Sequence, residues 1–334
     1  MMVPVLQNAD NAMVSVLIPC FNAEAFVGAA LDSVLAQTYS PIEISVVDDG
    51  STDGSLAVLE RFRERGVEII TQANAGQCAA ANRALAASRG AYVKFFDADD
   101  LLHPELIALQ MRALAGRTNA VALGEWARFH HAPDEAVFKP LAMYRNARPV
   151  DWLTDEFQTG ELMMQCATFL IPRSILDRTG GWDERLSLIN DFEFFARVLI
   201  AADEIVYAHG ARMFYRSAVS GSLSRQKSRR AADSAYLALL QGAGHLLDYE
   251  DSERTRLACA TILQTFEFEF YPAYANLRRK MREQIAVLGG GTGQPPGPPS
   301  FHMLRRFIGW RAARRVQHLA VRLGLNHAAR SRSR

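Results

Sequence analysis

Segments typical of strands and of helices alternate at short spacing from residue 13 to residue 96, and this alternation restricts the fold more than any other feature. The strand-like segments are apolar and rich in β-branched residues, and they span residues 13–21, 42–47, 67–72 and 91–96. The segments between them have the apolar spacing or the terminal glycine of helices, at residues 23–39, 56–66 and 76–90. This order predicts an α/β fold, in which helices flank a mostly parallel sheet on both faces.

Acidic residues follow two of the strand-like segments. Asp48 and Asp49 come after the second segment, in the stretch DDGSTDGS, and Asp97, Asp99 and Asp100 come after the fourth. Parallel α/β sheets bind their ligands beyond the carboxyl ends of the strands. The architecture and the acidic residues therefore predict the same place for a functional site.

The three aspartates after the fourth segment indicate a bound cation. Carboxylates this close together repel one another, and burial strengthens the repulsion. A helix cap would explain a residue next to the helix expected near Pro104, but it would not explain Asp97. Oxygen ligands of this kind suit Mg²⁺ or Mn²⁺, which bind one or two carboxylates together with water and substrate phosphates. We therefore expect Mg²⁺ or Mn²⁺ as the cofactor, with a diphosphate bound to it.

The stretch DDGSTDGS also matches part of a calcium-binding loop. The matching residues, at positions 1, 3, 5, 6 and 12 of the EF-hand pattern, are Asp49, Ser51, Asp53, Gly54 and Glu60. An EF-hand needs a helix before this loop, whereas a strand-like segment precedes it here. A turn in which Thr52 or Asp53 caps the next helix is the simpler interpretation.

The remaining chain divides into regions of different composition. Residues 106–152 give weak signals, residues 163–184 are periodic again, a helix is expected at 192–202, and one or two strands are expected at 204–218. We expect an α/β domain at residues 13–225, a helical region at 226–288, a flexible Gly/Pro linker at 289–300 and an arginine-rich tail at 301–334.

The net charge of +1 hides an uneven distribution. Nine arginines and no acidic residue lie between Arg305 and Arg334, which leaves −8 for the residues before them. The chain as a whole has no basic excess, so nucleic acid is not an expected partner. The tail has an apolar stripe into which arginines intrude, so a solvated helix, a disordered arm and a peripheral contact with anionic lipid all remain open for it.

Four dispersed cysteines predict a cytoplasmic location. Cys20, Cys78, Cys166 and Cys259 form no C-x-x-C pair, which argues against a zinc site and against a disulfide framework. The first residues lack the pattern of a signal peptide, and no stretch of about 18 uninterrupted apolar residues could span a membrane. If the tail does contact lipid, we expect the contact at the inner face of the membrane.

Four motifs resemble those of family 2 glycosyltransferases, which are inverting enzymes with the GT-A fold. In order along the chain they are VSVLIPCFNAE, IEISVVDDGSTDGS, NAGQCAAANRALAASRGAYVKFFDADD and GGWDERLSLINDFEFFARV. The likeness runs from about Met13 to Ser224. It implies that the α/β domain is a GT-A domain followed by a helical C-terminal extension.

The resemblance also implies roles for individual residues. Pro19 and Phe21 would line the pocket for the nucleotide base, and Asp49 would accept a hydrogen bond from a uracil-like base. Asp97 would lie near the ribose. Asp99 would bind the metal, with Asp100 in support. Asp191, the second residue of the ND pair, would be the catalytic base.

The chemistry of sugar transfer is consistent with these roles. A divalent cation neutralises the charge that develops on a leaving diphosphate, and one carboxylate on the opposite face of the sugar is enough for a single displacement. Asp191 begins a helix whose dipole would favour the ionised carboxylate, although the same position would also suit a helix cap. The implied partners are a nucleoside-diphosphate sugar as donor and a saccharide or lipid-linked hydroxyl as acceptor.

The chain departs from the family pattern at several positions. Phe21 stands where tyrosine is common, and Asn190 stands where glutamate is common. Ser217, Ala218 and Val219 follow the Tyr-Arg pair, where family members often have a histidine. Processive synthases carry Q-x-x-R-W, but here Arg230 replaces the tryptophan, which favours transfer of a single sugar.

Two other functions remain as alternatives. A nucleotidyltransferase would also use a metal and strand-end carboxylates, but it would usually carry a Gly-rich loop and a basic residue after the first strand, which PCFNAEAF lacks. A non-catalytic protein that binds nucleotide sugars would not need both Asp99 and Asp191. We therefore expect a metal-dependent hexosyltransferase or a related enzyme of polysaccharide or glycolipid synthesis, with a UDP-sugar as the favoured donor.

Overall fold

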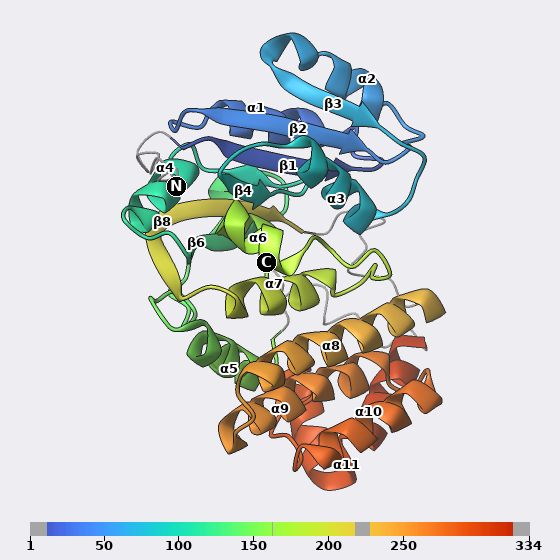
Figure 1. Ribbon diagram of the computed structural model, residues 1–334. Helices are drawn as coiled ribbons and strands as arrows, with labels where there is room; N and C mark the ends of the chain where they lie inside the picture. Colours follow the sequence, from blue (N-terminus) through green and yellow to red (C-terminus); the bar gives the residue numbers. More distant parts are fainter. Residues whose placement is uncertain (1–11, 162, 218–227, 323–334) are drawn as a thin grey trace.

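A computed structural model describes residues 12–161, 163–217 and 228–322. In these ranges eight strands form one sheet, in the order β3-β2-β1-β4-β7-β6-β8-β5 (Figure 1). The strands are β1 (Val14–Cys20), β2 (Ile42–Asp48), β3 (Val67–Thr71), β4 (Tyr92–Phe95), β5 (Leu101–Leu102), β6 (Ala120–Phe129), β7 (Phe169–Pro172) and β8 (Glu204–Arg216). β3, β2, β1 and β4 are parallel, and β7 then pairs antiparallel with both β4 and β6.

Helices cover the sheet and extend beyond it. The α-helices are α1 (Val27–Leu35), α2 (Ser55–Glu60), α3 (Gln77–Ala87), α4 (Leu106–Leu114), α5 (Pro149–Thr159), α6 (Arg173–Thr179), α7 (Asn190–Ile200), α8 (Arg229–Tyr249), α9 (Glu253–Phe270), α10 (Ala275–Val287) and α11 (Pro299–Arg322). α8 to α11 form a helical layer at one end of the molecule, and β3 and α2 lie at the other end (Figure 1). None of the helices in the described ranges is long and apolar enough to cross a bilayer.

The central strand β1 is buried on both faces, as expected for a parallel strand between two helical layers. Val16 and Ile18 belong to the hydrophobic cluster on one side of the sheet, and Leu17 belongs to the cluster on the other side. This alternation explains why β1 reads as a continuous apolar run in the sequence.

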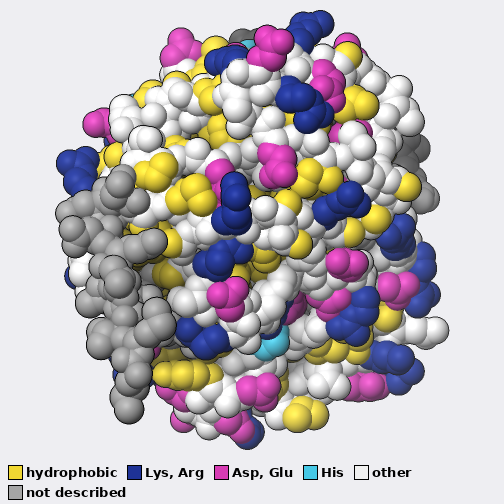
Figure 2. Space-filling view, turned by 45° about the horizontal axis from the view of Figure 1, so that its top comes forward, with side chains coloured by type: hydrophobic (Ala, Val, Ile, Leu, Met, Phe, Trp, Pro, Cys, Tyr) yellow, Lys and Arg dark blue, Asp and Glu magenta, His cyan; other side chains and the backbone are white. Residues whose placement is uncertain are grey.

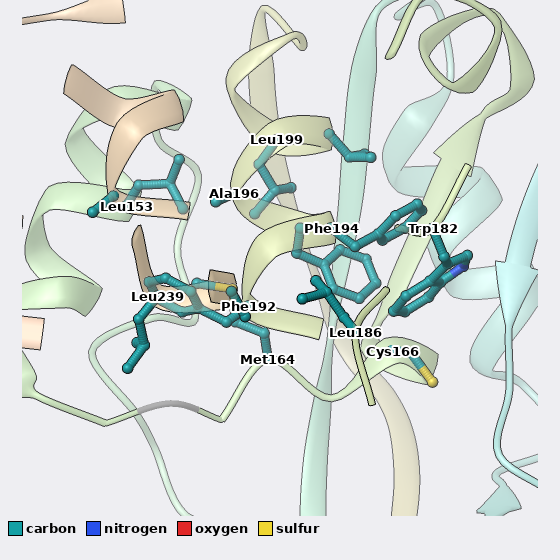
Figure 3. Packing of buried hydrophobic residues seen from close by; sticks show 14 of the residues in the cluster. Leu153, Met164, Cys166, Trp182, Leu186, Phe192, Phe194, Ala196, Leu199 and Leu239 are labelled. Carbon is teal, nitrogen blue, oxygen red and sulfur yellow. The ribbon is translucent and has the colours of Figure 1, made fainter. Parts of the chain in front are cut away.

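α7 joins the sheet to the C-terminal helices through its phenylalanines. Phe194 stacks on Trp182 with ring centroids 4.0 Å apart, whereas Phe192 points toward Leu239 of α8 (Figure 3). A Cβ on Gly242 of α8 would lie 2.4 Å from the Phe192 ring, so this glycine allows the two helices to approach closely. The hydrophobic core therefore continues from the sheet into α8, α9 and α10.

The predicted α/β fold class is confirmed, and the alternating elements up to β4 lie close to their expected places. β6 lies within residues 106–152, where the sequence patterns are too weak to predict an element. Glu125 interrupts its apolar pattern, although the carboxylate is buried and accepts hydrogen bonds from the Tyr207 hydroxyl at 2.6 Å and the Gly210 amide at 2.9 Å. Residues 204–218 were expected to form one or two strands, and the structure has the single long strand β8 here.

The Gly/Pro segment at residues 289–300 differs from the flexible linker that its composition predicts. The Thr292 amide donates to the Thr261 hydroxyl at 3.1 Å, and the Gly293 amide donates to the Gln264 side chain at 2.7 Å. The Gln264 amide in turn donates to the Gly291 carbonyl at 3.1 Å. The segment therefore lies along α9, where its small residues permit close contact.

Candidate functional site

The sheet brings the sequence-predicted residues together at the carboxyl ends of three neighbouring strands. Pro19 lies near the end of β1, Asp48 ends β2 with Asp49 directly after it, and Asp97 follows β4. β1 lies between β2 and β4, and Cys20 of β1 pairs with Asp48 of β2. Residues up to 78 positions apart in sequence are therefore neighbours at one edge, where parallel sheets bind ligands.

Phe21 presents an aromatic ring to solvent beside this edge. Its side chain is 50% exposed, in contrast to the buried Cys20 before it. Pro19 is partly buried and lines a small hollow of about 10 Å³ together with Asp97 and Trp182. An exposed ring next to a strand end is available to stack on a planar group such as a nucleotide base.

Asp49 holds the backbone that leads into α3. Its carboxylate accepts hydrogen bonds from the Gln72 side chain at 2.7 Å and from the Ala75 and Gly76 amides, both at 2.8 Å. Asp48, to which the sequence analysis assigned no role, is also buried, and its Oδ1 has no hydrogen-bond partner among the described residues. The acceptor without a partner at the end of β2 is therefore the buried Oδ1 of Asp48, whereas both carboxylate oxygens of Asp49 already accept hydrogen bonds.

The three aspartates after β4 have different surroundings. Asp97 accepts hydrogen bonds from the side chains of Gln77 at 2.9 Å and Gln165 at 3.3 Å. Asp100 is fully buried and accepts from Gln165 Nε2 at 2.6 Å and from the Arg216 amide at 2.7 Å. In the described residues, the Asp99 carboxylate accepts no hydrogen bond from another residue. Asp99 is thus the carboxylate of the cluster that is free to bind a ligand.

Burial raises the pKa of every carboxyl group in this cluster. The pKa of Asp97 is raised to about 7 by burial and by the charge of Asp99. Burial raises the pKa of Asp99, and burial with the charges of Asp99 and Asp97 raises the pKa of Asp100 well above its ordinary value. A divalent cation would favour the ionised forms and offset this repulsion.

The carboxylates of the acidic cluster suit a hard divalent cation, most of whose ligands are water and substrate oxygens. Among the described residues, no three or more His, Cys, Asp or Glu side chains converge to form a closed metal site. One free carboxylate, completed by water and phosphate oxygens, is the way in which Mg²⁺ and the similar Mn²⁺ bind at nucleotide sites. Asp99 is the residue that would hold the ion.

Asp191 lies in the first turn of α7 but does not cap it. The N-cap residue is Ile189, and no side chain caps this helix end. No described residue donates a hydrogen bond to the Asp191 carboxylate, so this group is free to act on a ligand. Burial and the charge of Asp97 raise the pKa of Asp191 well above its ordinary value, whereas the helix dipole alone was expected to favour ionisation. The expected direction was therefore wrong, because burial outweighs the dipole.

The loop before Asp191 is held in a strained conformation from α8. Ile189 has φ 60° and ψ 24°, a left-handed conformation that is unfavourable for a β-branched residue. The Ser234 hydroxyl of α8 accepts hydrogen bonds from the Ser187 and Leu188 amides, both at 2.8 Å, and donates to the Leu188 carbonyl at 2.9 Å. The C-terminal helices thus help to position Asp191, which the sequence analysis did not foresee.

Amide side chains link Asp191 to the acidic cluster. Asn190 donates to the Gln77 side chain at 3.3 Å, and Gln77 donates to Asp97. Gln165 then bridges Asp97 and Asp100. The fully buried Lys94 donates to the carbonyls of Ala167, which lies in the turn that follows Gln165, and of Phe169, which ends this turn. The adjacent ND pair and the strand-end aspartates could have pointed to this network, but Gln165 had no signal in the sequence.

Trp182 was left open between a sugar platform and a core residue, and the structure places it in the core. It is buried, one ring face stacks on Phe194, and Phe95 packs edge-on at 5.2 Å. Its indole N–H has no hydrogen-bond partner among the described residues. Cys78 and Cys166 are buried as well, as expected.

The segment after the Tyr-Arg pair is described only in part. The Ser217 hydroxyl donates to the Phe129 carbonyl at 3.1 Å and lies 3.0 Å from His130 Nδ1. Ala218, Val219 and Gln226 lie outside the described residues. His130 and His131 are exposed, as expected for surface loop residues. An imidazole therefore does lie beside Ser217, although it comes from a different segment.

Comparison with known proteins agrees with this geometry. The family model described as Glycosyl transferase family 2 matches residues 15–180. Glycosyltransferase GlyA of Streptococcus pneumoniae is 36% identical over 121 residues, which are 36% of this chain and 17% of GlyA. The putative teichuronic acid biosynthesis glycosyltransferase TuaG of Bacillus subtilis is 28% identical over 165 residues, 46% of this chain and 66% of TuaG. The chain spans between 17% and 30% of the length of the first curated relatives that it matches.

Solved structures show the same fold. Residues 1–349 of Staphylococcus aureus TarS in complex with UDP superpose with a TM-score of 0.65 at 19% identity, over 83% of this chain and 80% of that 1–349 chain. At this identity the likeness shows the fold alone, which is the expected GT-A fold with C-terminal helices. The family match identifies residues 15–180 of this chain as a glycosyl transferase family 2 domain, and the shared fold agrees with it.

Proposed function

We propose that this chain transfers a single sugar from a nucleoside-diphosphate sugar to a hydroxyl acceptor, with inversion at the anomeric carbon. A UDP-sugar is the favoured donor, and the acceptor belongs to a cell-surface polysaccharide or glycolipid. The structure of TarS with UDP and the relative named for teichuronic acid biosynthesis support this choice of substrate classes.

The observation that carries the proposal is the junction between Asp191 and the strand-end cluster. The Asp191 carboxylate accepts no hydrogen bond from a described residue, and it lies close enough to Asp97 for the charge of Asp97 to raise the pKa of Asp191. The side chains of Asn190 and Gln77 link the start of α7 to Asp97 by hydrogen bonds. A transferase of this kind needs one carboxylate at the attacking side and acidic residues at the leaving group. We assign the first role to Asp191 in α7 and the second to the aspartates that follow β4.

In the proposed reaction, Asp191 accepts the proton of the acceptor hydroxyl as the oxygen attacks the anomeric carbon. A new carbon–oxygen bond forms, the bond between the sugar and the diphosphate breaks, and the nucleoside diphosphate leaves with the electron pair. The raised pKa of Asp191 makes it a stronger proton acceptor than an ordinary aspartate. A divalent ion on Asp99, when bound, supplies neutralising charge to the leaving diphosphate.

The base of the nucleotide is assigned to the ends of β1 and β2. The exposed ring of Phe21 stacks on it, beside Pro19. The hydrogen bond to the base is accepted by the Asp48–Asp49 pair, in which the Oδ1 of Asp48 is the unengaged atom. Asp97, at the centre of the network, lies toward the ribose.

The test is calorimetric titration of the purified chain with UDP, GDP and dTDP, each with and without Mn²⁺. Binding of UDP that depends on Mn²⁺ is expected, and it should be lost in Asp99→Ala. Asp191→Asn keeps the shape of the side chain but not its basicity, so it should bind UDP normally and lose transfer. Binding by the native chain without any transfer to hydroxyl acceptors would favour a non-catalytic protein that binds nucleotide sugars. Native turnover by Asp191→Asn would remove Asp191 from its role as base.

A further inference from the structure

The last helix, α11, exposes large apolar side chains to solvent. Phe307 is 80% exposed and Met303 is 64% exposed, and Ile308, Val316 and Leu319 are exposed as well. Single exposed apolar residues are ordinary on a protein surface, but α11 exposes five within 17 positions, three before Gly309 and two after it. We call these five residues the α11 apolar patch.

The geometry of α11 presents the patch outward while anchoring the helix inward. Gly309, with φ 74° and ψ 158°, breaks α11 into two helical segments. Phe301 in the first segment and Ala313 in the second are buried, so each segment has an inner side. Met303 and Phe307 are four positions apart and therefore lie on one face of the first segment. α11 is therefore packed against the protein through Phe301 and Ala313, while the five patch residues face solvent.

α11 carries basic side chains beside the patch and has no acidic residue of its own. Arg305, Arg306, Arg311 and Arg315 interleave with the apolar residues, and the sequence contains no acidic residue after Glu283. Arg311 pairs with the buried Glu267, which already pairs with Arg278 and Arg282. In the described part of the chain, Arg306 and Arg315 form no ion pair. Positive charge is therefore in excess around the patch.

The face that Figure 2 displays differs from α11 in its charge distribution. Figure 2 shows acidic and basic side chains interspersed over the face that it displays, without a field of one sign. α11 lies in the helical layer, at the opposite end of the molecule from β3 and α2 (Figure 1). If α11 contacted an extended surface such as a bilayer, the end of the sheet that carries β3 and α2 would therefore stay exposed to solvent.

We propose that α11 docks the protein on a bilayer of anionic phospholipid, with the α11 apolar patch inserted at the boundary between head groups and acyl chains. Phenylalanine with methionine and aliphatic residues, flanked by arginine, is the composition of helices that lie on such surfaces. A second copy of the chain fits less well, because a symmetric contact would bring two arginine-rich faces together. The lipid surface supplies both the apolar interior and the negative charge that this face lacks.

The experiment is sedimentation of the full chain with vesicles of phosphatidylcholine alone and of phosphatidylcholine mixed equally with phosphatidylglycerol. Binding to the anionic vesicles alone is expected. Phe307→Ser should weaken it about tenfold, because a large apolar group is removed. Arg306→Gln combined with Arg315→Gln should weaken it about 25-fold, since each basic residue near such a surface contributes about fivefold.

The matched control is Val137→Ser, which removes an apolar side chain that is 69% exposed but lies far from α11 in the sequence. It should bind vesicles as the native chain does. Absence of vesicle binding by the native chain would overturn the proposal. Equal binding to neutral and anionic vesicles, unchanged by the arginine substitutions, would overturn it as well. If Phe307→Ser instead converts a dimer into a monomer in analytical ultracentrifugation, a second copy covers the patch and the proposal is wrong.

Discussion

Replacing Ser234 by alanine tests whether α8 positions the loop before Asp191, the proposed base. The Ser234 hydroxyl uses its full capacity, because it accepts from two amides and donates to one carbonyl of residues 187–188. Two of these bonds are buried, and a buried polar group without a partner costs about 1–3 kcal/mol. Ser234→Ala should therefore lower the free energy of unfolding by about 2–4 kcal/mol if water does not replace the hydroxyl.

The kinetic effect follows from the strain at Ile189. A left-handed β-branched residue costs about 1–3 kcal/mol and persists only while its neighbours hold it. Without the Ser234 hydroxyl, the loop should relax and displace Asp191, and a displacement of about 1 Å can slow a reaction about 100-fold. We expect kcat to fall by about two orders of magnitude, while the KM for the donor changes little, because the proposed role of Asp191 is to act on the acceptor.

The assay is steady-state release of nucleoside diphosphate, combined with urea unfolding of each variant. Ser228→Ala is the control, since Ser228 caps the same helix by accepting a hydrogen bond from the Ala231 amide and should cost about 1 kcal/mol. Ser234→Thr restores a hydroxyl and should recover part of kcat. If Ser234→Ala lowers kcat no more than Ser228→Ala does, the serine serves folding alone and our reasoning about the loop fails.

Three further substitutions test other parts of the structure. Asp48→Asn should weaken UDP binding about tenfold in calorimetry, whereas Asp49→Asn should mainly lower the free energy of unfolding, by about 1–3 kcal/mol, since its carboxylate holds the turn before α3. The reverse result would make Asp49 the member of the proposed pair that binds the base. Gly242→Ala should destabilise the protein by about 1–2 kcal/mol, because the added Cβ clashes with the buried Phe192 ring, while Gly244→Ala, whose added Cβ meets no atom within 4 Å, should stabilise it slightly. Equal effects of the two variants in urea unfolding would contradict the close contact between α7 and α8. Burial lowers the pKa of Lys94 from 10.5 to about 7. Between these pH values the unfolded chain binds a proton that the folded chain does not, so the free energy of unfolding should rise with pH. Lys94→Met should flatten this rise in melts taken across that range, and an unchanged slope would mean that Lys94 stays charged when buried.

Local patterns predicted the strand ends well. β1 to β4 have short, strongly apolar sequences, and Asp48, Asp49 and Asp97 follow them directly, so topology alone brought these residues to one edge. The free carboxylates of Asp99 and Asp191 also lie where the motifs indicated. In these cases the feature depends on residues that are adjacent in sequence.

Features that depend on distant partners were not predictable from the sequence. Gln165 lies in a segment without a motif, and its role becomes visible only where β7 pairs with β4. Ser234 resembles any other serine on a helix. The pKa of Asp191 reverses direction because of burial, which no local pattern reports. β6 was missed because Glu125 finds its hydrogen-bond partners in β8.

The hydrophobic core that continues from the sheet into α8, α9 and α10 limits how C-terminal regions can be exchanged between relatives. Phe192 and Leu239 pack against each other across the boundary expected between the α/β domain and the helical region (Figure 3). A chain cut after residue 225 would expose this aromatic surface to water, so we expect limited proteolysis to yield no stable α/β fragment. Exchange of C-terminal regions between relatives would therefore succeed only if α7 and its Phe192 face are transferred with the helices that cover them.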